Sequence, residues 1–124
     1  MLNSTSKPKK GETTWLWLLK IITGLLVIVI LIIHFIVNHF IAQGGLLTWA
    51  DVVRYYQNPI VPIMEIAFVT LVVSHSLIGL RGIILDLNPS RRMLSAVNWL
   101  FSAVGIVSIG YGIWLIQLIV SVGS

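Results

Sequence analysis

Residues 15–42 read WLWLLKIITGLLVIVILIIHFIVNHFIA, and this apolar run decides the fold class of the chain. Its strongly polar members are few and are Lys20, His34, Asn38 and His39. A helix needs about 20 consecutive apolar residues to cross a bilayer, and this run is longer. It is also much longer than the apolar region of a signal peptide, and no small-residue cleavage site follows it. We therefore interpret it as a retained transmembrane helix.

Two further apolar runs, at about residues 59–87 and 93–122, are also long enough to span a bilayer. With 57% hydrophobic and 10% charged residues, a soluble domain of 124 residues could not bury so much apolar surface. The sequence therefore predicts an all-α membrane protein with three transmembrane helices. These helices form one domain, residues 15–122, which follows a basic tail at residues 1–14.

The polar connectors indicate how the helices are oriented. Residues 46–58 mix aromatic and charged side chains, which suits a short amphipathic helix at the outer membrane surface. Basic residues gather in the N-terminal tail and around the 87–92 loop, whereas the 46–58 connector holds only Arg54. The positive-inside rule then places the N-terminus and the 87–92 loop in the cytoplasm of a prokaryote and the C-terminus outside its inner membrane.

Charge and cysteine content exclude several classes of function. The net charge of +4 resides in tails and loops at the membrane edges, so it does not indicate nucleic-acid binding. The chain has no cysteine, so it cannot by itself build a disulfide, a thiolate zinc site or an iron–sulfur cluster.

His75 lies inside the second apolar run, in the stretch HSLIGLRGIILD of residues 75–86. A polar ring in hydrocarbon is costly and usually has either a partner or a function. At 100° per residue, three others fall on nearly the same line of a helix: Gly79, Gly82 and Asp86. One interpretation is a ligand, with glycines that admit a bulky group. The other is a hydrogen bond to a neighbouring helix, with glycines that allow close packing.

The first run has a polar face of its own, formed by Lys20, Thr23, His34 and Asn38. The helical rise places His34 about 28 Å from the cytoplasmic end of its helix, and His75 about 16 Å from the same end. Two axial ligands of one iron lie only about 4 Å apart, so these histidines do not hold the same iron. For His34, a structural hydrogen bond and ligation remain alternatives.

The pattern His75-x-x-x-Gly79-x-Arg81-x-x-x-x-Asp86 resembles the second-helix signature of the membrane-anchor subunits of succinate dehydrogenase (succinate:quinone oxidoreductase). The resemblance implies that His75 is an axial ligand of haem b. It also implies that Asp86 lies at the cytoplasmic end, near the quinone pocket. Arg81, at the membrane edge, is a candidate contact for a haem propionate, because a guanidinium group suits a carboxylate.

The first run is similar to the same family in two places. Lys20-Ile21-Ile22-Thr23-Gly24 is like the entry of the family's first helix, with lysine where arginine is usual, so Lys20 is a second candidate propionate contact. Trp15 lies at the same level and joins Asp86 as a candidate wall of the quinone site. The stretch from His34 to His39 is like the two-haem branch, which makes His34 a candidate ligand of a second haem.

Two departures from the family pattern favour one type of anchor. Leu87 stands where some relatives have a quinone-contacting tyrosine, and the His-Arg-x-Ser-Gly motif of the companion anchor is absent. The sequence therefore favours the smaller, D-type anchor. The resemblance implies one or two haem b groups shared with a C-type anchor subunit, and it implies an iron–sulfur subunit, a flavoprotein subunit, lipid and a membrane quinone as partners.

Three other functions remain as alternatives. A fumarate reductase would use the same kind of anchor. A small transporter or channel subunit would use His75, Glu65 and Asp86 as a proton path. A scaffold protein would use the histidines and glycines only to pack helices.

Overall fold

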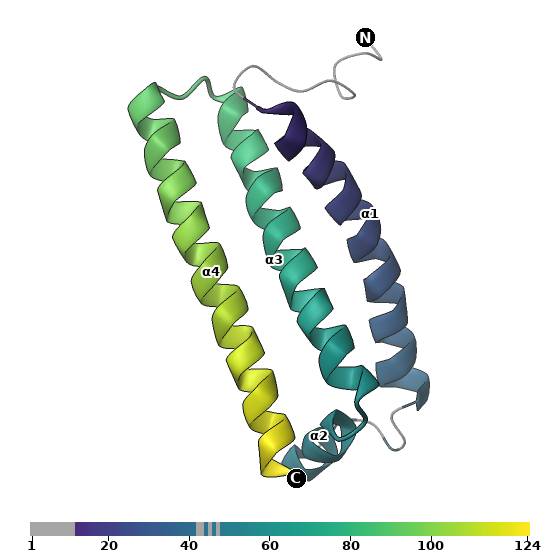
Figure 1. Ribbon diagram of the computed structural model, residues 1–124. Coiled ribbons are helices and arrows are strands. Elements are labelled where there is room, and N and C mark those ends of the chain that lie inside the picture. The colour runs from purple at the N-terminus through teal and green to yellow at the C-terminus, as the bar shows by residue number, and fades with distance from the viewer. Residues whose placement is uncertain (1–11, 42–43, 45, 47) are drawn as a thin grey trace.

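The computed structural model describes residues 12–41, 44, 46 and 48–124, which are helical in four places and contain no strand (Figure 1). The elements are α1 (Thr14–Ile36) with a π-helical continuation η1 (Val37–Ile41), α2 (Trp49–Tyr56), α3 (Ile60–Asp86) and α4 (Arg91–Val122). Three helices, including α1 with its continuation, are long and apolar enough to cross a membrane. The prediction of an all-α membrane protein with three spans is confirmed. Residues 1–11 of the predicted basic tail lie outside the described residues.

Helix α3 lies between α1 and α4, and consecutive long helices run in opposite directions (Figure 1). Within the described chain, α1 and α4 each pack on α3 and do not pack on each other. The short helix α2 lies across the end at which α4 finishes, and it packs on both α3 and α4. Because α3 has neighbours on two sides, its polar residues are the ones most readily enclosed by the chain.

Local signals explain where the helices begin and end. Thr13 caps α1 by accepting a hydrogen bond from Leu16 N at 3.2 Å, and Ser90 caps α4 in the same way. At the start of α2, Thr48 and Asp51 form a reciprocal capping box. Helix α3 ends before Asn88, which has a φ of 50°, a left-handed conformation that asparagine tolerates. The turns that separate the spans are therefore set by a few polar residues.

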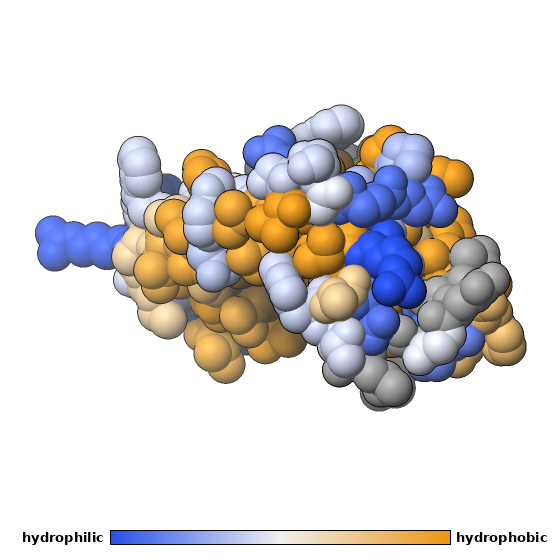
Figure 2. Space-filling model, turned by 90° about the horizontal axis from the view of Figure 1, so that it is seen from below, coloured by the Kyte–Doolittle hydropathy of each residue, from blue (hydrophilic) through white to orange (hydrophobic). Residues whose placement is uncertain are grey.

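Most large apolar side chains are exposed on the outer surface of the helices. On α1, Leu25 and Ile28 expose 64% and 58% of their surface, and on α4 Ile106 exposes 74%. The few buried apolar residues, such as Val61 and Ile116, lie where α3 and α4 meet their neighbours. Seen from the α2 end, hydrophilic residues lie among hydrophobic ones (Figure 2). Such an outward apolar surface suits lipid tails and the apolar faces of other membrane helices, because neither offers hydrogen bonds.

Candidate functional site

His75 lies in the middle of α3 and faces α1. Its Nδ1 is 3.2 Å from the Thr23 hydroxyl oxygen, and its Cε1 would lie 2.9 Å from a Cβ atom added to Gly24. A glycine at position 24 is therefore what allows the imidazole to lie so close to the α1 backbone. The hydrogen bonds of the described residues engage Nδ1 and leave Nε2 without one.

The residues that follow His75 on the same line of α3 differ in what lies beside them. Gly82 is buried, and a Cβ atom there would lie 3.6 Å from Lys20 Nζ, an ordinary van der Waals distance, so this position lies beside the Lys20 side chain. A Cβ atom at Gly79 would meet nothing within 4 Å. The α3 line therefore contacts α1 through His75 and Gly82 and stays open at Gly79.

Lys20 forms an ion pair inside the chain. Its Nζ lies 2.7 Å from Glu12 Oε1, and the Glu12 side chain is only 2% exposed. Lys20, which the sequence makes a candidate propionate contact, lies beside the Glu12 carboxylate in the structure. Glu12 was not among the predicted site residues, because eight residues of separation across a helix start give no periodic signal.

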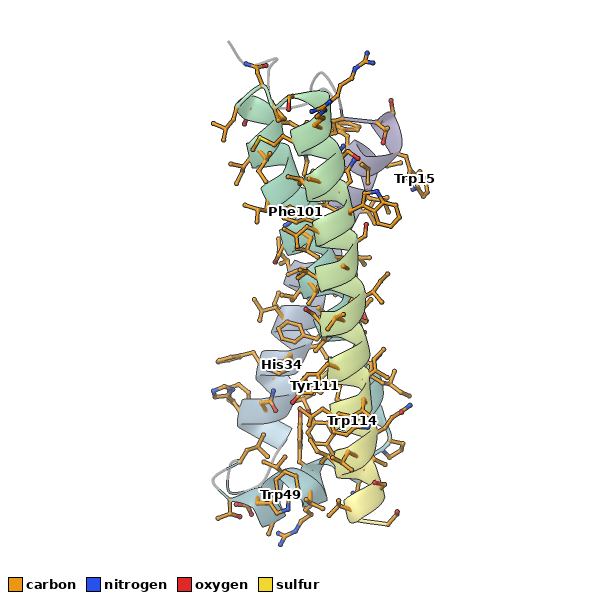
Figure 3. All side chains as sticks on the ribbon, turned by 90° about the vertical axis from the view of Figure 1, so that its left-hand side faces the viewer. Trp15, His34, Trp49, Phe101, Tyr111 and Trp114 are labelled. Carbon is orange, nitrogen blue, oxygen red and sulfur yellow. The ribbon has the colours of Figure 1, made fainter. Side chains whose placement is uncertain are left out.

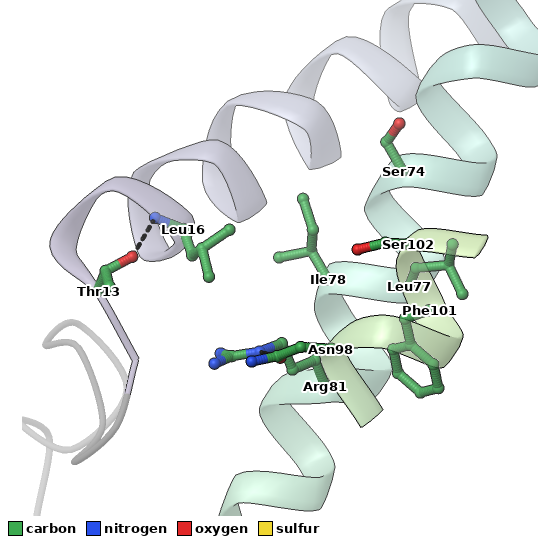
Figure 4. Close-up of a pocket in the computed structure, with 9 residues that line it drawn as sticks. All are labelled: Thr13, Leu16, Ser74, Leu77, Ile78, Arg81, Asn98, Phe101 and Ser102. Carbon is green, nitrogen blue, oxygen red and sulfur yellow. Dashed lines mark hydrogen bonds between the residues drawn. The ribbon is translucent and has the colours of Figure 1, made fainter. Parts of the chain in front are cut away.

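Arg81 faces away from His75, toward α4. Its Nε donates a hydrogen bond to Asn98 Oδ1 at 2.7 Å. Arg81 and Asn98 line a cleft of about 480 Å³ between the start of α1 and α4, over α3 (Figure 4). The structure therefore brings Lys20 to the His75 side of α3 and places Arg81 on another side. The remaining lining residues are Thr13, Leu16, Ser74, Leu77, Ile78, Phe101 and Ser102.

Trp15 and Asp86 lie at the same end of the molecule. Asp86 is the last residue of α3, and Trp15 is the second residue of α1, whose start lies beside the α3 end (Figure 1). Trp15 is 66% exposed, and in Figure 3 it projects outward at the end opposite Trp49. Both predicted quinone-site residues are thus exposed at one membrane edge.

His34 belongs to a second polar cluster, nearer the α2 end (Figure 3). Its Nε2 lies 2.9 Å from Asn38 Nδ2, and its Nδ1 lies 3.1 Å from Glu65 Oε1. The ring also stacks on Phe68, with 4.6 Å between the ring centroids. Both ring nitrogens of His34 therefore have neighbours within the chain. His34 lies beside Glu65, which is ten residues before His75 on α3. The two histidines are therefore at different depths, as the helical rise predicts.

Glu65 and its surroundings are the part that the sequence did not resolve. The sequence analysis named Glu65 only as part of an alternative proton path, whereas the structure buries it, with 8% exposure, beside His34 of the same chain. His34 Nδ1, Asn38 Oδ1 and the Tyr55 hydroxyl are buried there, and none of these atoms has a well-aligned hydrogen bond to another described residue. The four-residue spacing of His34 and Asn38 was the available signal for this cluster.

Helix α2 covers the second cluster with its tyrosines. Burial raises the pKa of Tyr55 well above its ordinary value, and the charge of Glu65 adds to this effect. Burial likewise raises the pKa of Tyr56 to about 12, again with a contribution from Glu65. His39, in contrast, is exposed, stacks on Phe35 and donates to the Phe35 carbonyl.

A metal ion held by this chain alone has no complete site in the described part. No three side chains of histidine, cysteine, aspartate or glutamate converge among the described residues. What the chain offers there is single imidazoles, His75 on one level and His34 on another. A haem iron bound here would need its other axial ligand from elsewhere.

Comparison with known proteins decides the family. Residues 3–110 match the family described as succinate dehydrogenase/fumarate reductase transmembrane subunit. The chain belongs to this family. A succinate dehydrogenase hydrophobic membrane anchor subunit from Archaeoglobus fulgidus is 33% identical over 100 residues, which cover 81% of this chain and 85% of that protein. No solved structure matches.

Family membership and the three spans together define this multi-pass membrane protein as a succinate dehydrogenase/fumarate reductase membrane anchor subunit. The succinate dehydrogenase anchor predicted from the His75 pattern is confirmed at this level. The polar face of α1 is directed toward α3. Thr23 and His34 both contact α3, so the conspicuous polar residues of two membrane helices meet each other.

Proposed function

We propose that this anchor holds haem b through His75 and forms one wall of a quinone site, so that electrons from succinate reach the membrane quinone. The observation that carries the haem assignment is the state of the His75 ring. Its Nδ1 is held by Thr23, and its Nε2 has no hydrogen bond among the described residues. An imidazole nitrogen of this kind is a common axial ligand of haem iron, and a bound haem would supply one-electron transfer.

The residues around His75 fit a large planar group. Gly79, one turn along α3, leaves open space where a side chain would stand, and Gly24 lets the ring lie against α1. The chain supplies one axial ligand, and we assign the other to a companion C-type anchor. His34 is the less suitable ligand, because a second haem would require its ring to leave Asn38 or Glu65.

The end that carries Trp15 and Asp86 is the proposed quinone end. Both side chains are exposed there, and the arginines at the start of α4, Arg91 and Arg92, lie at the same end. An excess of positive charge is typical of a cytoplasmic face. We assign this end to the cytoplasmic side of a prokaryotic inner membrane. An iron–sulfur subunit and a flavoprotein subunit would dock there and deliver electrons from succinate.

The test is the optical spectrum of the complex purified with its partner subunits. His75→Leu should remove a b-type haem signal, while His39→Leu, at an exposed histidine whose contacts are with Phe35 on its own helix, should leave it intact. Assembly is checked independently by whether succinate oxidation with a soluble dye, an activity that needs no anchor-bound cofactor, co-purifies with an affinity-tagged anchor. An unchanged spectrum in assembled His75→Leu complex would refute the haem assignment.

A further inference from the structure

Thr23 makes three polar contacts with its single hydroxyl group, and the longest of them is 3.3 Å, to the Lys20 carbonyl oxygen. Its oxygen lies 2.7 Å from the Leu19 carbonyl oxygen and 3.2 Å from His75 Nδ1. A carbonyl oxygen only accepts hydrogen bonds, so Thr23 can form the shorter of these hydrogen bonds only by donating its proton to Leu19, one turn earlier in the same helix. The Thr23 oxygen is then left as an acceptor for His75. Thr23 is 8% exposed, so water does not compete freely for this position.

We infer that Thr23 is a positioning residue that holds His75 in the tautomer with its proton on Nδ1 and its lone pair on Nε2. A neutral imidazole carries one proton, and a metal binds the nitrogen that lacks it. Because Nδ1–H donates its hydrogen bond to Thr23, the lone pair of Nε2 is available to bind iron in the haem-free protein as well. This inference rests on the proposed function, in which His75 is a haem ligand, and adds the residue that selects its ligating form.

Gly24 completes the arrangement by fixing where the ring lies. A Cβ atom at this position would approach three atoms of the His75 ring, with 2.9 Å to Cε1, 3.5 Å to Nδ1 and 3.7 Å to Nε2. The ring edge is therefore seated against two consecutive residues of α1. Thr23 orients the ring and Gly24 makes room for it, and neither residue is assigned a contact with the iron.

The hydrogen bond should also lower the midpoint potential of the haem iron. A ligating imidazole that donates its second N–H becomes a stronger base and favours the ferric form. Losing the acceptor should therefore raise the haem midpoint potential. It should also weaken haem retention about tenfold or more, which is the usual effect of removing such a partner.

The experiment compares Thr23→Val with Thr23→Ser in the complete complex. Valine keeps the shape but removes the acceptor, so the midpoint potential should rise and haem should be lost more readily. Serine restores a hydroxyl and should return both values toward those of the unaltered complex. Thr70→Val makes the same substitution on α3, five residues before His75, and should change neither.

Each outcome decides between the two assignments. Loss of the haem signal in His75→Leu together with an unshifted potential in Thr23→Val would overturn the role of Thr23 alone. An unchanged signal in His75→Leu would overturn both the haem assignment and the role of Thr23. If Thr23→Val does not assemble, Thr23→Cys retains the size with a weaker acceptor. That variant should shift the potential in the same direction, and no shift would overturn the inference.

Discussion

His34 Nδ1 on α1 lies 3.1 Å from Glu65 Oε1 on α3, and this contact joins two membrane helices at the end covered by α2. The Glu65 side chain is 11% exposed. A carboxylate is costly in such a place unless it has a partner, so the pair is an important contact between α1 and α3. It also gives Glu65 a structural role that needs no proton path.

Replacing Glu65 alone should destabilise the anchor. Glu65→Leu removes the carboxylate that lies 3.1 Å from the buried His34 Nδ1 and so loses the attraction of the ion pair, at a cost of about 2 kcal/mol. The double variant His34→Leu/Glu65→Leu removes both polar groups and should be more stable than the single variant. Thermal unfolding of the complex in detergent measures both. A double variant less stable than Glu65→Leu would show that the pair does not act as one unit.

Tyr56 should lose its phenol proton at a higher pH than an exposed tyrosine does. Burial raises its pKa to about 12, so the folded protein keeps the phenol proton in a range where an unfolded chain loses it. The stability from this group is complete below pH 10 and declines as the pH rises from about 10 to about 12. Phenolate absorbance of the anchor minus that of Tyr56→Phe isolates the group. A midpoint near pH 10 would contradict its burial.

Adding one methyl group at Gly24 should disturb the His75 ring. In Gly24→Ala the new Cβ atom would lie 2.9 Å from His75 Cε1, so the ring must move and the Thr23 hydrogen bond lengthens. Haem content, measured by pyridine haemochrome per flavin, should fall. Gly110→Ala is the matched control, because its Cβ atom would meet nothing within 4 Å. Equal haem content in the two variants would argue against close seating of the ring on α1.

Quinone reduction should be sensitive to Trp15. If Trp15 contacts the quinone, Trp15→Ala removes an aromatic contact of about 1 kcal/mol, which corresponds to a several-fold higher KM for quinone. Succinate oxidation with a soluble dye should not change. Trp114→Ala provides the control, since Trp114 is similarly exposed but lies nearer the other end of the molecule (Figure 3). The same KM change in both variants would remove the quinone site from the Trp15 end.

Much of the architecture follows from local sequence. Each apolar run satisfies its own backbone hydrogen bonds as a helix, so length and hydropathy alone predict a span. Thr13 and Ser90 begin helices by capping backbone N–H groups three residues ahead, and Asn88 follows the end of α3 in a left-handed conformation. The predicted spans of 15–42, 59–87 and 93–122 correspond to helical spans at Thr14–Phe40, Ile60–Asp86 and Arg91–Val122.

The sequence by itself thus determined the helices, the family pattern around His75 and the polar face of the first span. Only the tertiary structure decided which polar groups meet. Thr23 reaches His75 across 52 residues of chain, and Arg81 turns to Asn98 rather than to the His75 side of α3. Helical periodicity gives the direction of a side chain relative to its own helix. The partner depends on the rotation and depth of the neighbouring helix, which is set by packing between helices and by small residues such as Gly24.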